Sequence, residues 1–502
     1  MLTAACSRSA DKRTLQLINC DFLSRPPDGR RWLLWRVLLC GLALAAAVDG
    51  ASAQRTDPFA TRAQRPPAPS AFWPGAGLPC ARPDVLPDPL RLSEVIDLAL
   101  CNNAQTRESW ASAKAQAAAL GIAQSFYLPD ITGSVSVQRS EVRNVRNSGG
   151  TSTLDAAISI NYLLFDFGGR DANVELARQS LLAANWSHNN TLQLVMLGAV
   201  QGYYQLYATQ EAVQATLAAE KAALTSLEAA RARQKAGTAT RADVLQTQTA
   251  YSQAQLNRTQ AEGDAAVAKG VLANAMGLSA ERPLRIAQPP DLQMQKTAEQ
   301  AVESLIETAR SRRPDLAAAE AQVRAGQSNI RVQEAAAKPS LSAFGSIGQT
   351  LASPGSDPRT GAIGLQLTIP LFTGFRNTYR ILQAREQLEI DQATRDRLST
   401  DVALDVWRAY QDLRTQRQSL DTANDLVASA QENYNVALGR YRAGVGTITD
   451  LLNAQSALVN AELQRIQARF RWNLAKATLA RSIGVLDPAL IAGALAPTSG
   501  GQ

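Results

Sequence analysis

Histidine is almost absent from this chain, since His188 is the only one among 502 residues. This scarcity excludes a catalytic triad that contains histidine and a metal site built from several histidines. The acidic residues are scattered without a paired constellation, so the sequence predicts no enzyme, no cofactor and no bound metal. His188 stands in a polar stretch of a predicted helix, and we expect it to be exposed to solvent.

Aromatic residues and long apolar runs are also scarce. Aromatics make up 5% of the chain, and stretches rich in Ala, Gln, Leu, Arg and Glu are typical of extended helices rather than of a large globular core. Beyond the N-terminal region, no apolar run reaches the roughly 18 residues of a transmembrane helix candidate. The net charge of +7 is small and scattered, which argues against a nucleic-acid partner.

The N-terminal region has the order of a secretory signal peptide. Basic residues up to Arg36 precede an apolar run over 37–48, and an Ala-Ser-Ala sequence ending at Ala53 follows. We therefore assign residues 1–53 to a signal peptide cut after Ala53. A membrane anchor is the alternative, although the run is shorter than the roughly 20 residues of a span. The long segment before the arginines is unusual in a signal and leaves the start of translation open.

Export would leave two of the five cysteines, Cys80 and Cys101, in an oxidising compartment. A disulfide between them is one possibility and two free thiols are the other. Cys80 lies in a leader over 54–90, where prolines are spaced too densely for a helix or the interior of a sheet.

An internal repeat with a spacing of about 207–210 residues is the most informative feature of the sequence. Four blocks recur in the same order, as the pairs SEVIDLALCNNAQ and ESLIETARSRRPD, YLPDITGSVSV and AKPSLSAFGSI, LLFDFGGR and PLFTGFR, and KAGTATRADVLQTQ and RAGVGTITDLLNAQ. We place the first unit at 91–278 and the second at 302–485. A linker over 279–301 separates them, and a tail over 486–502 follows.

Each unit opens with a helical pattern and continues with strands. The opening stretches, over 93–128 and 303–338, each end at a proline-marked boundary and predict one helix each. Apolar residues then alternate, which predicts hairpins over 131–164 and 341–370. The turn-forming sequences NSGGT and SPGSDP are the predicted hairpin turns.

Each hairpin is followed by a long helical stretch without proline, from Arg170 to Gly237 and from Arg376 to Gly444. Either stretch would span about 100 Å as one helix. A tight turn at the glycine then leads into a closing helix of roughly 38 residues. Opening and closing helices together match the long helix in length, so each unit should form two antiparallel columns with a hairpin at one end.

Four strands with an apolar face raise the question of how their edges are paired. In a bilayer, two unpaired sheet edges are not tolerated, so several copies must close a barrel. Three copies give twelve strands and leave room for a pore. We therefore expect a homotrimer.

This plan, with YLPDI, LFDFGGR and a glycine turn followed by DVLQTQ, resembles the TolC family of outer-membrane factors over about residues 90–485. The resemblance implies a mainly α fold with a small β part, which trimerises into a 12-stranded β-barrel in the outer membrane and an α-helical tunnel in the periplasm. It also implies three kinds of partner, namely outer-membrane lipid, a periplasmic adaptor (membrane fusion) protein, and an inner-membrane ABC exporter or proton-driven pump.

The cargo is a finer question than the family. The segment ALCNNAQTRESWASAKAQAAALGIAQ, from Ala99, resembles the type I secretion members, which implies export of a protein toxin. Multidrug efflux is the alternative within the family. A secreted coiled-coil structural or adhesion protein is the alternative from another class.

The resemblance assigns a periplasmic gate to four residues, Asp243, Asp450, Asn453 and Tyr441. In a trimer the aspartates would form an acidic ring that narrows the tunnel mouth and attracts cations. Asn453 stands where the family often has a second aspartate, and Gly446 where it commonly has a basic residue, so the gate would be weaker or differently held. The structural alternative is that a threonine three residues before each aspartate caps a helix, and that Tyr441 packs in a core.

Two further sets of residues complete the predicted sites. Arg233 with Gly237, and Arg440 with Gly444, form the helical tips that meet the adaptor in this family, although the glycines could simply be left-handed helix caps. Aromatic residues flank the strand ends, where a belt at the lipid boundary would lie; a minor core cluster is the alternative. The predicted belt is Phe126, Tyr127, Phe165, Phe167, Phe372 and Phe375.

Overall fold

The structure is a computed structural model that describes residues 57–66, 86–144, 147–289, 301–353 and 355–486. The predicted signal peptide, most of the leader, part of the linker and nearly all of the tail lie outside the described residues. Residues 59–502 cluster as one compact unit, and every contact discussed below lies within it.

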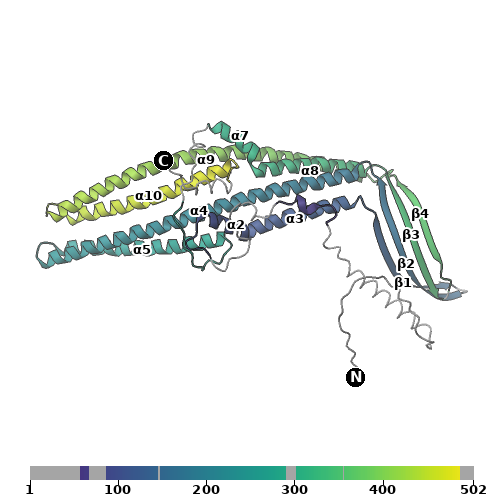
Figure 1. Cartoon of the computed structure of the whole chain (residues 1–502), viewed down its shortest axis with the longest axis horizontal. Helices are drawn as coiled ribbons and strands as arrows, with labels where there is room; N and C mark the ends of the chain where they lie inside the picture. Colours follow the sequence, from purple (N-terminus) through teal and green to yellow (C-terminus); the bar gives the residue numbers. More distant parts are fainter. Residues whose placement is uncertain (1–56, 67–85, 145–146, 290–300, 354, 487–502) are drawn as a thin grey trace, which may run out of the picture. The chain divides into compact units, whose positions relative to one another are not determined.

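The elements follow the predicted duplication (Figure 1). The first repeat contains α2 (Leu92–Asn102), α3 (Ala104–Ser125), β1 (Asp130–Asn144), β2 (Asn147–Phe165), α4 (Gly169–Lys235) and α5 (Arg241–Ala275). The second repeat contains α7 (Val302–Arg312), α8 (Pro314–Ala336), β3 (Ser340–Ser353), β4 (Arg359–Thr368), α9 (Arg376–Arg442) and α10 (Ile448–Ser482). The long helices α4 and α9 have 67 residues each, which corresponds to about 100 Å. The mainly α fold with a small β part is thus confirmed.

The prediction of one opening helix per repeat is wrong, because both opening helices are broken. Asn103 and Arg313 have extended backbones, with ψ of 136° and 123°. Pro314 explains the second break, since proline disfavours the helical conformation of the residue before it. At the first break the Asn103 side chain caps α3, accepting from the backbone N–H of Gln105 at 2.8 Å.

Each break receives the end of the closing helix. Gly277 follows α5 with a φ of 69°, and a β-carbon there would lie 2.5 Å from the carbonyl oxygen of Asn102. Gly484 follows α10 with a φ of 74°, and a β-carbon there would lie 2.9 Å from the backbone of Arg312. Only glycine combines this conformation with this close approach.

Two apolar cores lie beside these joints. The larger one packs α2 and α5 against the middle of α4, where Tyr203 is fully buried and its hydroxyl donates to the carbonyl of Ala287 at 2.7 Å. The smaller one packs α7 and α10 against α9 around Val402 and Val406. Within the described residues, no helix has the length and hydropathy needed to cross a membrane.

The expectation that His188 is exposed is wrong. Its side chain has no solvent exposure, because α3 packs against this part of α4. Its Nδ1 lies 2.8 Å from the hydroxyl oxygen of Ser109, and its Nε2 has no hydrogen-bond partner among the described residues. Burial lowers the pKa of His188 below its usual value of 6.5, so the imidazole is neutral at pH 7.

Cys101, in α2, is disulfide-bonded. The other four cysteines, including the predicted partner Cys80, lie outside the described residues. The pairing of Cys80 with Cys101 therefore stays a prediction.

The four strands form one antiparallel sheet in the order β1-β2-β3-β4. The first predicted turn is misplaced, because the NSGGT sequence belongs to β2, and Asn144 already pairs with Asn147. The second is correct, and the amide of Ala352 donates to the Asp357 carboxylate across the connection at 3.1 Å. Among the described residues, β1 and β4 are edge strands with a partner on one side only.

Candidate functional site

The strand register gathers the alternating apolar residues of all four strands on one face of the sheet. One row runs from Ile131 to Ile160, Gly345 and Ile363, so each strand contributes to the same side. The large side chains of this face are exposed in the chain, with Ile363 reaching 93%. They are Ile131, Val135, Val137, Ile158, Ile160, Tyr162, Ile347, Ile363, Leu365 and Leu367.

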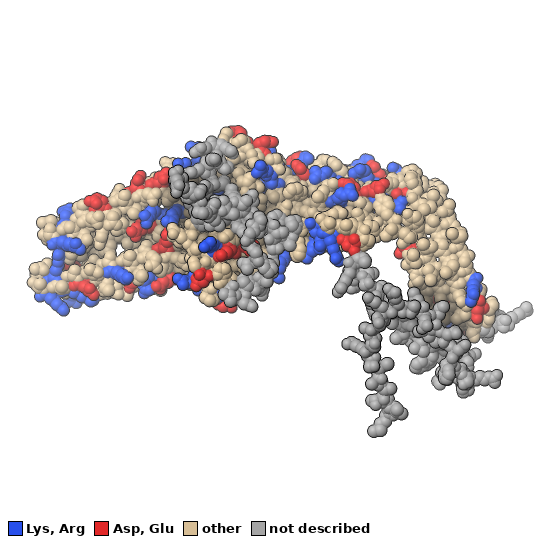
Figure 2. Space-filling view, viewed as in Figure 1, with Lys and Arg blue, Asp and Glu red and all other residues tan. Residues whose placement is uncertain are grey.

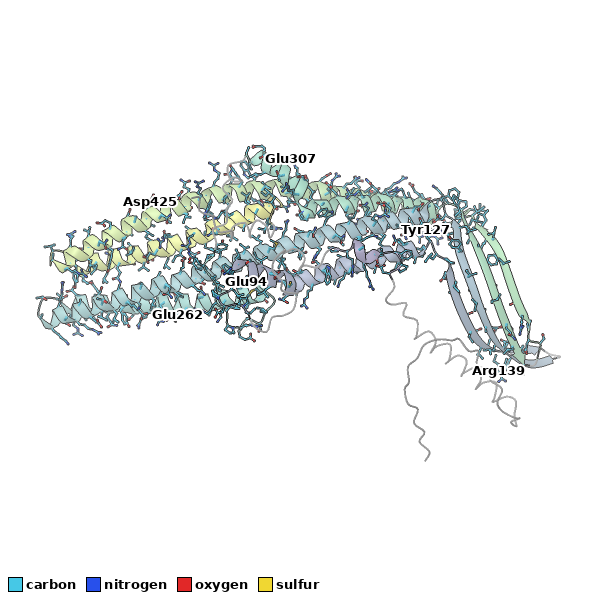
Figure 3. The ribbon with its side chains drawn as sticks, in the orientation of Figure 1. Glu94, Tyr127, Arg139, Glu262, Glu307 and Asp425 are labelled. Atoms are coloured by element: carbon cyan, nitrogen blue, oxygen red, sulfur yellow. The ribbon has the colours of Figure 1, made fainter. Side chains whose placement is uncertain are left out.

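The opposite face of the sheet is mostly polar. Thr132 and Ser159 pair across β1 and β2 with their hydroxyl oxygens 2.7 Å apart. The hydroxyl of Thr350 donates to the Asp155 carboxylate at 2.6 Å. In Figure 2 few charged atoms are visible over the strands until the far end, near the Arg139 labelled in Figure 3. An apolar face with few charges, backed by a polar face, suits a sheet between lipid and a water-filled pore.

The six predicted belt aromatics are all exposed, from 38% for Tyr127 to 76% for Phe372. Two edge-to-face pairs form, Phe165 with Phe167 at 4.8 Å between ring centroids and Phe372 with Phe375 at 5.6 Å. None of the six belongs to the buried clusters of the described residues, which argues against the core alternative.

A β-bulge decides where Phe165 points. The register shifts between Leu163 and Phe165, so that Leu163 pairs with Ser342 while Phe165 pairs with Leu341. Without the shift, Phe165 would lie on the polar face; with it, Phe165 joins the apolar face. Sequence reasoning missed this bulge, because the extra residue, Leu164, is as apolar as its neighbours.

The junction from strand to long helix has the same unusual backbone in both repeats. Phe167 and Gly168 have φ of 53° and 82°, and Gly374 and Phe375 have φ of 62° and 61°. Each junction thus contains two consecutive left-handed residues, one phenylalanine and one glycine, in opposite order. A left-handed phenylalanine is strained by roughly 1–2 kcal/mol.

Arg170 secures the first junction. Its guanidinium donates to the carbonyls of Leu163 at 2.7 Å and Leu164 at 3.1 Å. Its backbone N–H donates to the Asp166 carboxylate at 2.7 Å. The motif LLFDFGGR marked this residue in the sequence, but its role as a clamp on the bulge follows only from the structure.

The helical tips turn on left-handed glycines, as the structural alternative proposed. Gly237 and Gly444 have φ of 75° and 77°. The amide after each glycine returns to the last turn of the long helix, from Thr238 to the carbonyl of Arg233 at 2.9 Å and from Val445 to that of Arg440 at 3.0 Å. These bonds are those of a C-terminal helix cap.

Both aspartates stand in reciprocal capping boxes. Asp243 receives the amide of Thr240 at 2.8 Å while the Thr240 hydroxyl accepts from the Asp243 amide, and Thr447 with Asp450 repeats the arrangement. Hydrogen bonds from the side chain and backbone of Thr447 lower the pKa of Asp450, with a contribution from Arg440. Asp450 therefore keeps its negative charge on the exposed surface, and Asn453 is exposed one turn further along α10.

Arg233 and Tyr441 come together although the sequence assigned them to different sites. The guanidinium lies 4.2 Å from the Tyr441 ring centroid, and both terminal nitrogens donate to the Tyr441 carbonyl at 3.3 Å. Tyr441 is 9% exposed and packs with Ile448 and Leu451, so its core alternative is observed within the chain. The contact joins the tip of the first repeat to the tip of the second, which lie at the same end of the long helices in Figure 1.

The chain is similar to known proteins in sequence and in fold. The sequence model described as "Outer membrane efflux protein" matches residues 95–278 and 305–485. The chain belongs to this family. Its members are the TolC-like channels that the sequence resembles. The two matched segments each cover most of one repeat, and together they span more than half of the channel.

Relatives match the channel over most of its length. Protein CyaE of Bordetella pertussis is 30% identical over 407 residues, covering 80% of the channel and 84% of that protein. Outer membrane efflux protein BepC of Brucella suis is 28% identical over 399 residues, covering 76% and 84%. The crystal structure of the outer membrane protein VceC from Vibrio cholerae superposes with a TM-score of 0.67 at 19% identity, covering 78% of the channel and 96% of that chain.

These matches confirm the predicted family, fold class and location. The channel resides in the outer membrane, extends into the periplasm and exports cargo from the inner-membrane side to the outside.

Proposed function

We propose that three copies of the chain close a twelve-stranded barrel, with the apolar sheet face toward lipid and the polar face toward the pore. The observation that carries this proposal is the register, which places the apolar residues of four strands on one side and, among the described residues, leaves β1 and β4 with free edges. Free edges and an exposed apolar face are both removed by joining β4 of one copy to β1 of the next.

The mass of the purified protein in detergent, with its conductance in a planar bilayer, tests this proposal. A trimer that conducts ions supports it. A folded monomer that never conducts would contradict it.

The gate is proposed at the tips. Three copies of Asp243 and of Asp450 surround the tunnel mouth and favour cations, while Asn453 adds no charge. The capped, ionised state of Asp450 supports this role. The contact between Arg233 and Tyr441 holds the two tips of one subunit together. We propose that this contact is present when the gate is closed.

Replacing Asp450 by Ala tests the acidic ring. The ratio of cation to anion permeability should fall, because the fixed charge at the narrowest point decreases. Asp425→Ala, on α9 away from the tip (Figure 3), is the matched control. An unchanged permeability ratio in Asp450→Ala would remove this residue from the gate.

The partners and cargo form the finer part of the proposal. Arg233 with Gly237 and Arg440 with Gly444 would face a periplasmic adaptor, which connects the channel to an inner-membrane ABC exporter or proton-driven pump. Type I secretion of a protein toxin is supported by the segment from Ala99. The likeness to BepC, an efflux protein by name, favours multidrug efflux as the second candidate. In either case the chain conducts its cargo and catalyses no reaction.

Reconstitution with each transporter class separates the two cargoes. Export of a protein substrate only with an ABC exporter and its adaptor supports secretion. Drug resistance restored only with a proton-driven pump supports efflux.

A further inference from the structure

A groove lies at the junction of the helices and the sheet. Its volume is about 860 Å³, within the usual range of ligand sites. The N-terminal turns of α4 form one wall and the C-terminal end of α8 forms the other. Tyr127, labelled in Figure 3 where the helices meet the sheet, also lines the groove. Its charged and aromatic lining residues are Tyr127, Phe167, Asp171, Glu175, Arg178, Arg331, Glu334 and Lys338.

The groove is continuous with the apolar face of the sheet. Phe165 lies on that face, because it pairs with Leu341 beyond the bulge. The Phe167 ring packs edge-to-face against Phe165 and lines the groove. Lys338 then lies over the Phe167 ring, 5.9 Å from its centroid. A path of contacts therefore leads from the lipid-facing side chains directly to the charged groups.

The charges of the lining balance. Arg178, Arg331 and Lys338 carry three positive charges, and Asp171, Glu175 and Glu334 carry three negative ones. Asp171, Glu175 and Arg178 follow one another at helical spacing on α4, as Arg331, Glu334 and Lys338 do from α8. A ligand that carries both signs of charge fits such a lining better than a simple anion or cation.

Two of the cations lack an acidic partner among the described residues. Arg178 pairs with Glu175 at 2.6 Å, whereas the Arg331 guanidinium donates to the Ser328 hydroxyl at 3.1 Å. The Lys338 ammonium lies over the Phe167 ring. An anionic group would therefore meet two available cations.

Two acids on the α4 wall, Asp171 and Glu175, can bind a positively charged group of the same ligand. Asp171 accepts a hydrogen bond from the Tyr127 hydroxyl, and Glu175 is bonded to Arg178 and Gln179. A carboxylate has about four acceptor positions, so both can accept from a further N–H group. A primary ammonium, with three N–H donors, would satisfy both acids at once.

We propose that this groove binds the headgroup of a phospholipid that carries a primary ammonium, such as phosphatidylethanolamine, from the periplasmic leaflet. Its phosphate binds Arg331 and Lys338, its ammonium binds Asp171 and Glu175, and its acyl chains follow Phe167 and Phe165 onto the apolar face. The inference rests on the proposed function in one respect, the placement of that face against lipid. A free phosphate would leave the aromatic path unused, and a headgroup with several negative charges would meet the three acids.

Native mass spectrometry of the full-length protein in detergent tests the site. The protein is mixed with phosphatidylethanolamine, phosphatidylcholine or phosphatidylglycerol with identical chains. The protein should retain phosphatidylethanolamine about ten-fold more strongly than phosphatidylglycerol, because only the former supplies the ammonium. Phosphatidylcholine should be retained less than phosphatidylethanolamine, since its quaternary ammonium donates no hydrogen bond.

Two double variants divide the site. Arg331→Gln with Lys338→Gln should lower the retention of phosphatidylethanolamine about ten-fold or more. Asp171→Asn with Glu175→Gln should keep phosphate binding and lose the preference over phosphatidylglycerol. Arg324→Gln is the control on α8, because Arg324 bonds Gln179 outside the groove lining.

Equal retention of the three lipids by the parent protein would overturn the proposal, as would unchanged retention in the Arg331 and Lys338 double variant. Displacement of the lipid by excess inorganic phosphate would indicate a free-anion site and also overturn it. Mass and conductance are measured on the same preparations. A conducting trimer without lipid preference contradicts this inference alone, whereas a non-conducting monomer contradicts the proposed function.

Discussion

The two repeats build the same joint with different polar chemistry. In both, the opening helix breaks and a left-handed glycine from the closing helix approaches the break. At the first joint Asn103 donates to the carbonyl of Ala275 at 3.1 Å, a neutral contact. At the second, Arg313 pairs with Asp315 at 2.5 Å and with Asp405 at 3.1 Å. The shared feature is the backbone approach, and the side chains around it were free to diverge.

The second joint is charged and partly buried. Burial alone would raise the pKa of Asp315, but the hydrogen bond and charge of Arg313 hold it below its usual 3.8. Burial lowers the pKa of Arg481, and the nearby Arg313 lowers it further. The stability of this joint therefore depends on keeping all these charges together, which the first joint does not require.

Replacing the shared glycines should have the largest effect. Gly277→Ala places a β-carbon 2.5 Å from the Asn102 carbonyl oxygen. We expect strain and overpacking to lower the free energy of unfolding by about 3–4 kcal/mol. Gly484→Ala should lower it by slightly less. Hydrogen exchange of α2 and α7 measures the local opening. Gly237→Ala, also left-handed but with open space around it, is the control and should cost about 1 kcal/mol. Equal losses at all three positions would contradict the joint.

The charged joint should be more sensitive than the neutral one. Arg313→Met leaves Asp315 without its partner, and we expect a loss of about 2–3 kcal/mol, less than for a fully buried pair because Asp405 is 44% exposed. Asn103→Ala should cost about 1 kcal/mol, the usual value of a helix cap. Thermal unfolding in detergent compares the two. A larger loss of unfolding free energy in Asn103→Ala than in Arg313→Met would contradict the greater sensitivity of the charged joint.

Acid should weaken the repeats in different pH ranges. The lowered pKa of His188 means that only the unfolded chain takes up its proton below pH 6.5. Stability should therefore fall as the pH drops below about 6.5, until the histidine of the folded protein is protonated as well. Asp315 also has a lowered pKa, but it is an acid, so its contribution persists until the pH falls below about 3.8.

Unfolding at a series of pH values checks this order. His188→Gln should remove the decline in the mildly acidic range and leave the decline at lower pH. A parent protein whose stability is constant from pH 7 to about 5 would contradict the assignment of a buried neutral histidine.

The smallest expected effect concerns the tips. Arg233→Gln removes the cation over the Tyr441 ring, worth about 0.5–1 kcal/mol at a half-exposed site. The open fraction of the channel should rise by about two- to five-fold. Arg440→Gln, the counterpart in the second repeat, is the control. Equal opening in the two variants would mean that the link between the repeats is not what holds the tips.

Features that depend only on residues close together in the chain could be predicted from the sequence. The capping boxes at Thr240 and Thr447, the glycine tips and the apolar alternation of the strands are all local patterns, and the structure has each of them. Pro314 is a sequence signal for the second helix break. The regular spacing of the apolar residues across it, however, also fits one continuous helix. The break at Asn103 carried a weaker signal, since an asparagine cap can also stand inside a helix.

Features that depend on contacts between residues far apart in the sequence could not be predicted from it. His188 is buried because Ser109, 79 positions away, packs on it. Arg233 meets Tyr441 across 208 positions. Neither partner is marked by composition or spacing, and both contacts require the packing of one helix on another.

The bulge between Leu163 and Phe165 decides which face of the sheet the end of β2 presents to lipid. In a ladder that continued without the bulge, Leu164 would pair with Leu341, and Phe165 would turn from the membrane to the aqueous lumen. A change of register by one residue, with every side chain kept, would then interrupt the aromatic path to the headgroup groove. Strand register at this point is therefore as much a determinant of lipid contact as side-chain identity.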